Sequence, residues 1–198
     1  MDTSDRAREL TYYVAASLDG CIAAPDGDFG AFPQAGDHFD AILAEFADTL
    51  PIHAQTALGV AADGSRFDTV LMGWNTYLPA LDAGIASPYP HLRQIVATRT
   101  ERQVDAAIET TADPVATVRA LKDSPGGGIW LAGGGALAAT LIDEIDRLIL
   151  KVNPLVFGSG IPLFAGAAYA PRTFELVTSR SFESGVTIAQ YVRTTSAA

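Results

Sequence analysis

The chain has 198 residues, of which 48% are hydrophobic and 18% are charged, and its formal net charge at pH 7 is −10. This size and composition predict one folded domain that buries roughly 70% of its unfolded surface, and they argue against disorder. The negative charge argues against nucleic acid and anionic membranes as partners, because both would repel the chain.

A single domain is expected over residues 1–198, with flexible ends over 1–8 and 194–198. The longest apolar run is too short and too rich in glycine to span a bilayer, and the first ten residues lack the basic and apolar regions of a secretory signal. Cys21 is the single cysteine, so an internal disulfide is excluded. These features predict a cytoplasmic protein without a membrane segment.

The first predicted element is a strand over residues 10–17, LTYYVAAS. It ends at an Asp-Gly pair, which favours a turn. A long loop rich in glycine and proline follows over 21–37, and long loops in compact domains are often functional.

The next segment, DHFDAILAEFADTL, predicts a helix that packs on a sheet. Phe39, Ile42 and Phe46 recur in it at spacings of three and four, and Asp37 is the expected N-cap. Residues 51–66 show no clear hydrophobic period, so we expect an irregular segment there.

Strands and helices then alternate. Strands are predicted over 67–73, 93–100, 128–132 and 145–157, the last running into a turn, and helices over 74–81, 113–123 and 135–144. Asp113 as N-cap and Pro114 at the first helical position support the second of these helices. The alternation is typical of a parallel sheet with connecting helices.

The end of the chain has a different pattern. Segments 172–182 and 185–193 alternate apolar with polar residues around a short turn, which predicts an antiparallel hairpin. The sequence therefore predicts an α/β fold: a mostly parallel central sheet, helices on both faces and a C-terminal antiparallel hairpin.

Ligands of such sheets bind beyond the carboxyl ends of the strands. Polar residues and glycines gather at these ends, in 17–22, 73–76, 98–100 and 133–137. Motifs for a P-loop, a zinc site or a serine hydrolase elbow are missing. The three histidines are scattered and are expected to be loop or surface residues, so no metal site is predicted.

Three consecutive glycines, Gly133, Gly134 and Gly135, stand between a predicted strand and a predicted helix. The unpaired N–H groups of a helix N-terminus favour anions, and glycines let a pyrophosphate approach the backbone closely. A simple tight turn would need the same residues, and both interpretations are open at this point.

Five segments at the strand ends, VAASLDGCIA, VLMGWNT, IVATRT, WLAGGGAL and DRLILKVNPLVFGSGIPLF, resemble the dihydrofolate reductase-like family in order and spacing. The likeness covers nearly the whole chain and is greatest to the bacterial branch related to the reductase domain of riboflavin biosynthesis, the RibD C-terminal type. It implies an eight-stranded sheet that binds NADPH and transfers a hydride to a heterocycle or a sugar imine.

The resemblance implies a role for each strand end. Ala15 and Ile22 match positions that meet the nicotinamide, and Gly73 and Thr76 match the element that holds the pyrophosphate. Trp74 stands where the family usually has an arginine aimed at the phosphates, and its indole could stack on adenine instead. NADH as the cofactor is therefore not excluded.

Two more strand ends complete the implied cofactor site. Thr98 and Arg99 end a strand where the family binds the adenosine 2′-phosphate. The segment from Gly133 through Gly134, Gly135 and Ala136 to Leu137 matches the family's glycine pair beside the phosphates, which is often joined by a cis peptide.

The substrate side matches the family less closely. Asp40, on the helix where the resemblance implies a carboxylate, is the candidate for the catalytic acid, and a position on a solvated helix face is the alternative for this residue. Riboflavin-type reductases commonly have a glutamate before the glycines, but this chain has Ala132. The zinc deaminase of the bifunctional riboflavin enzyme needs more cysteines than Cys21.

The favoured prediction is an NADPH-dependent reductase acting on a small pterin-like or pyrimidine-like substrate. One alternative is a reductase of the 5-amino-6-(5-phosphoribosylamino)uracil type, and another is a nucleotide-binding module without catalysis. A homodimer that pairs through the segment TIAQYV is also possible.

Overall fold

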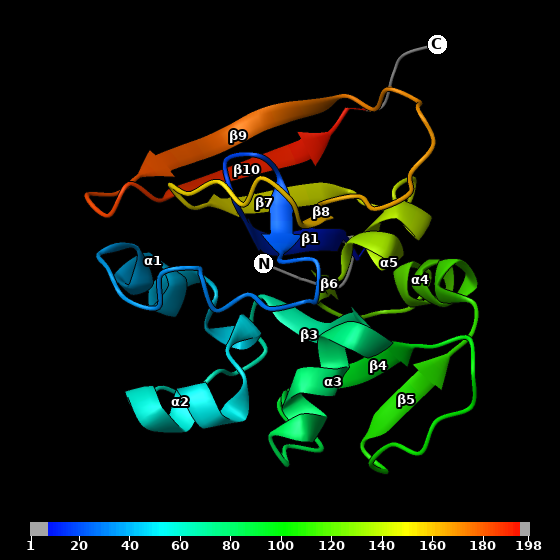
Figure 1. The fold of residues 1–198 in the computed structure, drawn as a ribbon. Helices are drawn as coiled ribbons and strands as arrows, with labels where there is room; N and C mark the ends of the chain where they lie inside the picture. Colours follow the sequence, from blue (N-terminus) through cyan, green and yellow to red (C-terminus); the bar gives the residue numbers. More distant parts are fainter. Residues whose placement is uncertain (1–7, 195–198) are drawn as a thin grey trace.

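A computed structural model describes residues 8–194 of the chain (Figure 1). The strands are β1 (Leu10–Ala16), β2 (Cys21–Ala23), β3 (Phe67–Gly73), β4 (Arg93–Ala97), β5 (Ile108–Thr111), β6 (Gly128–Gly133), β7 (Arg147–Val152), β8 (Ile161–Pro162), β9 (Phe174–Ser181) and β10 (Thr187–Arg193). The α-helices are α1 (His38–Glu45), α2 (Ile52–Leu58), α3 (Trp74–Asp82), α4 (Pro114–Lys122) and α5 (Gly135–Thr140), and a 3₁₀ turn spans Ala47–Thr49. None of the described helices is long and apolar enough to cross a membrane.

The central sheet has eight strands in the order β5-β4-β3-β6-β1-β7-β10-β9. The pairings from β5 to β7 are parallel, whereas β10 runs antiparallel to both β7 and β9. Figure 1 shows α1 to α3 and α4 with α5 as separate groups about this sheet. The predicted α/β fold, with a mostly parallel sheet, helices on both faces and a terminal antiparallel hairpin, is confirmed.

The core consists of two layers, one on each face of the sheet. In β3, Val70 and Met72 pack in the layer beneath α1 and α3, while Leu71 between them packs in the layer beneath α4 and α5. Side chains of a strand alternate between faces, so a strand buried on both sides reads as a continuous apolar run. This explains why VLM is uninterrupted by polar residues.

Two segments differ from the sequence prediction. Residues 52–58, expected to be irregular, form α2, which ends at Gly59 with φ of 65°. Its buried Gln55 donates to the Leu50 carbonyl at 2.7 Å and accepts from the Ala62 N–H at 3.0 Å. A polar residue therefore occupies the buried face of α2, which is why no hydrophobic period marks it.

Short strands were also missed. β5 lies at one edge of the sheet, and of its residues only Ile108 is buried, so its composition resembles a loop. β2 interrupts the long loop predicted over 21–37 and pairs with β8 in a separate two-stranded ribbon. Edge and ribbon strands need few apolar residues, so their pattern is weak.

The start of α1 is held by the C-terminal hairpin. Asp37 is the N-cap residue of α1 as predicted, but its side chain makes no capping hydrogen bond; its carboxylate accepts hydrogen bonds from the backbone N–H groups of Glu183 and Ser184 instead. His38 is fully buried, which corrects its assignment as a loop or surface histidine, and its Nδ1 lies 3.0 Å from the Ser184 hydroxyl. The hairpin tip thus fixes α1 against the sheet.

The segment TIAQYV forms most of β10, which lies between β7 and β9. Its backbone groups are paired on both sides, so the predicted pairing of this segment between subunits is wrong. The edge at this end of the sheet is β9 instead.

The flexible ends expected over 1–8 and 194–198 lie outside the described residues except for Arg8 and Thr194. Arg8 is buried and hydrogen-bonds to Thr69 and to the Gly127 carbonyl, so the prediction is wrong for this residue. Thr194 donates to the Thr173 carbonyl.

Candidate functional site

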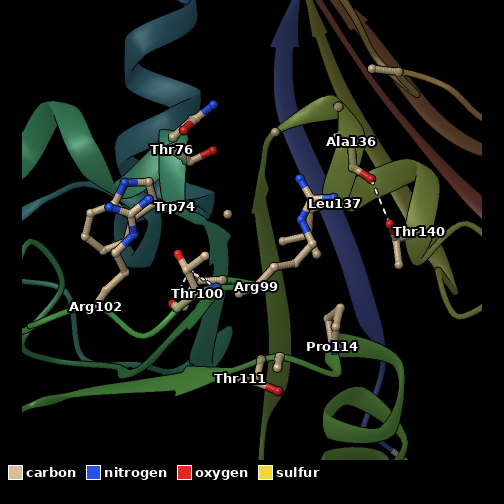
Figure 2. Close-up of a pocket in the computed structure, with 18 of the residues that line it drawn as sticks. Trp74, Thr76, Arg99, Thr100, Arg102, Thr111, Pro114, Ala136, Leu137 and Thr140 are labelled. Carbon is tan, nitrogen blue, oxygen red and sulfur yellow. Dashed lines mark hydrogen bonds between the residues drawn. The ribbon is translucent and has the colours of Figure 1, made fainter.

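A cleft of about 620 Å³ opens at the carboxyl ends of β3, β4 and β6 (Figure 2). It is lined by Gly73, Trp74, Asn75, Thr76, Ala97, Thr98, Arg99, Thr100, Arg102, Thr111, Ala112, Pro114, Gly134, Gly135, Ala136, Leu137, Thr140, Ile161 and Ala165. Its size is in the range of small-molecule and cofactor sites, and its place in the fold is the one expected for a parallel sheet.

Gly134 and Gly135 belong to one wall of the cleft, and the three glycines differ in how well they would accept a side chain. Gly133 has φ of 127°, where side chains are strained, and its peptide bond to Gly134 is cis, as the resemblance implied. A Cβ atom at Gly135 would collide with the Pro162 carbonyl oxygen. Gly134 faces the cleft, and a Cβ atom there would meet no atom nearer than the Thr76 hydroxyl, at 3.5 Å.

The opposite wall is the start of α3. Gly73 is its N-cap and supplies no side-chain cap, so the first N–H groups of the helix remain available to a ligand. The same is true of α5, whose N-cap is Gly134. The Thr76 hydroxyl lies between the two walls, as its distance from the glycines shows. The two helix starts and this hydroxyl offer donors suited to an anion.

The turn after β4 brings two arginines to the cleft. Thr98 accepts a hydrogen bond from the Thr100 N–H and donates to the Thr100 carbonyl, which holds the turn. Arg99 and Arg102 are exposed, and within residues 8–194 neither takes part in an ion pair. Their charges are therefore available to a bound anion.

Arg102 lies against Trp74, the residue at the position where the resemblance implies an arginine. Its guanidinium carbon lies 4.7 Å from the centroid of the Trp74 ring, and Figure 2 shows the two side chains together on one side of the cleft. A cation over an indole face is favourable by about 0.5–1 kcal/mol at an exposed site. The sequence did not single out Arg102, because it lies in an exposed turn beyond the strand end.

Most of the residues that the sequence assigned to the cofactor line this cleft. They are Gly73, Trp74, Thr76, Thr98, Arg99, Gly134, Gly135, Ala136 and Leu137, with Gly133 directly before them. Ala15 and Ile22 do not line it: Ala15 pairs with Lys151 in the sheet, and Ile22 lies in β2. Thr111 of β5 and the adjacent Ala112 also line the cleft, and they were missed because β5 was not predicted.

No carboxylate reaches this cleft from α1. Asp40 is exposed and is not among the lining residues, so the structure does not bring it to the glycines. Asp37 is bound to the hairpin, and Glu45 pairs with Arg180. Among the described residues no group of His, Cys, Asp and Glu is arranged to hold a metal ion.

Asp19, in the turn after β1, has a structural role. Its carboxylate accepts from the Ser17 hydroxyl and from the N–H groups of Phe157 and Gly158. The Ser17 hydrogen bond, with the two backbone bonds, lowers the pKa of Asp19 below its usual value. Asp19 therefore stays ionised and joins the turn to the loop after β7.

Comparison with known proteins shows similarity over most of the chain. Residues 8–188 match the family model of the RibD C-terminal domain. Uncharacterized protein YwjB of Bacillus subtilis (strain 168) is 32% identical over 162 residues, which are 79% of this chain and 83% of that protein.

Two solved structures show the same fold at low sequence identity. A diaminohydroxyphosphoribosylaminopyrimidine deaminase/5-amino-6-(5-phosphoribosylamino)uracil reductase from Thermotoga maritima aligns with a TM-score of 0.66 at 17% identity, covering 95% of this chain and 57% of that one. Dihydrofolate reductase from Enterococcus faecalis, complexed with NADP(H) and RAB-propyl, aligns with a TM-score of 0.63 at 18% identity, covering 94% of this chain and 97% of that one.

Proposed function

Because the chain belongs to the RibD C-terminal domain family, we propose that it is an NADPH-dependent reductase that transfers a hydride to a small heterocyclic substrate, pterin-like or pyrimidine-like. The family match and the two structural neighbours, both named as reductases, support an oxidoreductase. One of these neighbours was solved with NADP(H).

One observation carries the cofactor assignment. The whole chain has a net charge of −10, yet the residues that line the cleft include two arginines and no aspartate or glutamate. A cleft free of carboxylates in an acidic protein, with two uncapped helix starts beside it, favours a ligand with several negative charges. A dinucleotide with a 2′-phosphate is such a ligand.

Different residues of the cleft would bind different parts of the dinucleotide. Gly134, Thr76 and the first N–H groups of α3 would hold the pyrophosphate, and Trp74 would offer its face to adenine. Arg99 and Arg102 would bind the 2′-phosphate. A charge-assisted hydrogen bond contributes about 1.5–3 kcal/mol, which is roughly a ten- to hundredfold preference for NADPH over NADH. The cofactor, when bound, supplies the hydride.

A second candidate is a reductase of the 5-amino-6-(5-phosphoribosylamino)uracil type. The similarity to the Thermotoga maritima enzyme and to the RibD C-terminal domain favours it. Such a substrate carries a phosphate, so this candidate requires a cation on the substrate side of the site as well as on the cofactor side.

The proposal is tested by thermal shift with NADPH and NADH on the wild type, Arg99→Ala and Arg102→Ala. NADPH at one hundred times its Kd should stabilise the wild type by about 2.7 kcal/mol. Each variant should lose roughly ten- to hundredfold in affinity for NADPH and little for NADH. Arg93→Ala is the control, because Arg93 begins β4 at the other end of the strand and pairs with Glu109.

Turnover separates an enzyme from a binding module. NADPH oxidation is followed with dihydrofolate and with a ribosylaminopyrimidine phosphate as substrates. Absence of stabilisation by either cofactor would refute the reductase proposal, and tight NADPH binding without oxidation across a broad substrate panel would favour the module without catalysis.

A further inference from the structure

Lys151 lies on the face of the sheet that α1 covers. Ile149, two residues earlier in β7, packs in the same core layer as Ile42 of α1, and residues two apart in a strand share a face. The Lys151 ammonium is 5.9 Å from the centroid of the Phe39 ring, which also belongs to α1. Lys151 therefore points into the space between β7 and α1.

This space opens to solvent at the carboxyl end of the sheet. Lys151 pairs with Ala15 of β1 on one side and with Ile188 of β10 on the other. Two residues before Ala15 and Lys151, on the same face, Tyr13 is 8% exposed and Ile149 is fully buried. Ala15 and Lys151 themselves are only partly buried. The Lys151 side chain is therefore accessible to solvent beside the small side chain of Ala15.

Lys151 is partly buried, and among residues 8–194 its ammonium forms neither an ion pair nor a side-chain hydrogen bond. The sequence has two lysines among its 13 basic residues, and the other, Lys122, pairs with Asp146 at 2.6 Å. Within residues 8–194 no carboxylate forms an ion pair with Lys151. A partly buried ammonium without a counterion costs folding free energy, which points to a functional role.

The charged groups around Lys151 are few. His38 of α1 is the titratable neighbour, and its pKa is lowered mainly by burial and further by the charge of Lys151. Asp37 also acts on His38, but its carboxylate is held by the hairpin N–H groups. Burial lowers the pKa of Lys151 itself, so its proton is released more readily than that of a lysine in water.

We propose that Lys151 is the catalytic acid of this reductase, acting on a substrate with a C=N bond held between β7 and α1. The inference rests on the proposed function and on Ala15 lying beside the nicotinamide, as the resemblance implies. It gives the site the proton donor that Asp40 and Ala132 do not supply.

The carbon of the C=N bond receives a hydride and its nitrogen receives a proton. The hydride of NADPH adds to the carbon of the C=N bond, whose π electrons move to nitrogen. That nitrogen takes a proton from the Lys151 ammonium, so one C–H and one N–H bond form and NADP⁺ is released. The neutral amine recovers a proton from water, because Lys151 is partly exposed. Before the step, the same ammonium can hold an acidic oxygen of the substrate.

The presence of only two lysines allows a test that needs no known substrate. Reductive ¹³C-methylation labels Lys122, Lys151 and the amino terminus, and the resonances are assigned with Lys151→Arg and Lys122→Arg. We expect the Lys151 signal to titrate below free lysine, and NADP⁺, whose nicotinamide is positive, to move that signal and lower its pKa further. The Lys122 signal should not respond to NADP⁺.

Two failures are distinguishable in this experiment. Absence of NADP⁺ binding in a thermal shift refutes the proposed function. NADP⁺ binding that leaves the Lys151 resonance and its pKa unchanged refutes the role of Lys151 and leaves the proposed function standing.

Turnover gives the second measurement. With any substrate that the wild type reduces, Lys151→Met should lower kcat by about 10²- to 10⁴-fold, the usual contribution of an acid, and should remove the alkaline limb of the pH profile. Lys122→Met is the matched control. A folded Lys151→Met protein with wild-type kcat and pH profile would overturn the inference.

Discussion

At the scale of single residues, Trp74 and Arg102 together line the cleft, and the positive charge comes from position 102 and not from position 74. The resemblance implies an arginine where this chain has the indole of Trp74, and this difference left NADH open beside the favoured NADPH. The structure brings Arg102 over the face of that indole from the following turn. The pair places a cation and an aromatic face side by side at the cleft.

His38 is a second residue whose environment sets a measurable property. It is fully buried, and its Nε2 atom lacks a hydrogen-bond partner in residues 8–194. Burial lowers the pKa of His38 below the value of about 6.5 that it has in the unfolded chain. Protonation therefore favours unfolding. The burial of neutral His38 contributes to the free energy of unfolding. This contribution is fully present above pH 6.5 and is lost as the pH falls through the folded-state pKa.

We predict that His38→Gln reduces the loss of stability between pH 7 and pH 5. The difference from wild type should be about 1.4 kcal/mol for each pKa unit of lowering, since glutamine does not titrate. Urea unfolding at several pH values measures it, with His53→Gln on the exposed side of α2 as the control. Parallel stability curves for the wild type and His38→Gln would contradict the prediction.

At the scale of elements, two glycines in the connection from β6 to α5 are restricted by different neighbours: Gly135 by the packing of β8, and Gly134 by the cleft. Gly135 must lack a side chain because the Pro162 segment packs against it, and this packing carries a hydrogen bond from the Ala165 N–H to the Gly135 carbonyl at 3.0 Å. Gly134 has room for a methyl group, but that group would enter the cleft.

The two glycines should therefore respond differently to alanine. Gly134→Ala is expected to remain folded and to lose at least tenfold in NADPH affinity, because the methyl group keeps the pyrophosphate from the backbone. Gly135→Ala is expected to lower the melting temperature, since the chain of β8 must move. Calorimetry and NADPH titration separate the effects. Normal NADPH affinity in Gly134→Ala would remove this glycine from the phosphate site.

Elements with a local sequence signal could be predicted, and elements without one could not. Long buried strands such as β3 and the start of α4 at Asp113 were predicted closely, because burial on both faces and a side-chain cap leave local signals. α2 and β5 were missed, since a buried Gln55 and an edge position leave none. Arg102 and Lys151 could not be assigned, because their places depend on contacts with other elements.

At the scale of the whole molecule, the sheet has one apolar edge. Leu176 and Val177 of β9 are 53% and 51% exposed, and β9 has a paired neighbour on one side only within the described residues. An exposed apolar edge strand favours pairing with another chain. The homodimer stays a prediction, but its pairing strand becomes β9 in place of β10.

We predict that the protein sediments as a dimer and that Val177→Lys shifts it to the monomer. A lysine on an edge strand opposes pairing through its charge and hydration. Leu58→Lys, on the exposed end of α2, is the control and should leave the dimer intact. A monomeric wild type in analytical ultracentrifugation at tens of micromolar would rule this dimer out.

The position of β1 has a consequence for how the protein is made. β1 precedes the other strands of the sheet in the sequence, yet its neighbours in the sheet, β6 and β7, come from residues 128–133 and 147–152. On one side of β1 lie β5, β4, β3 and β6, and on the other β7, β10 and β9, so β1 alone joins the two groups of strands. Contacts so distant in sequence slow folding. On the ribosome, β1 must therefore wait unpaired until most of the chain has emerged, and chaperones have the longest access to this strand.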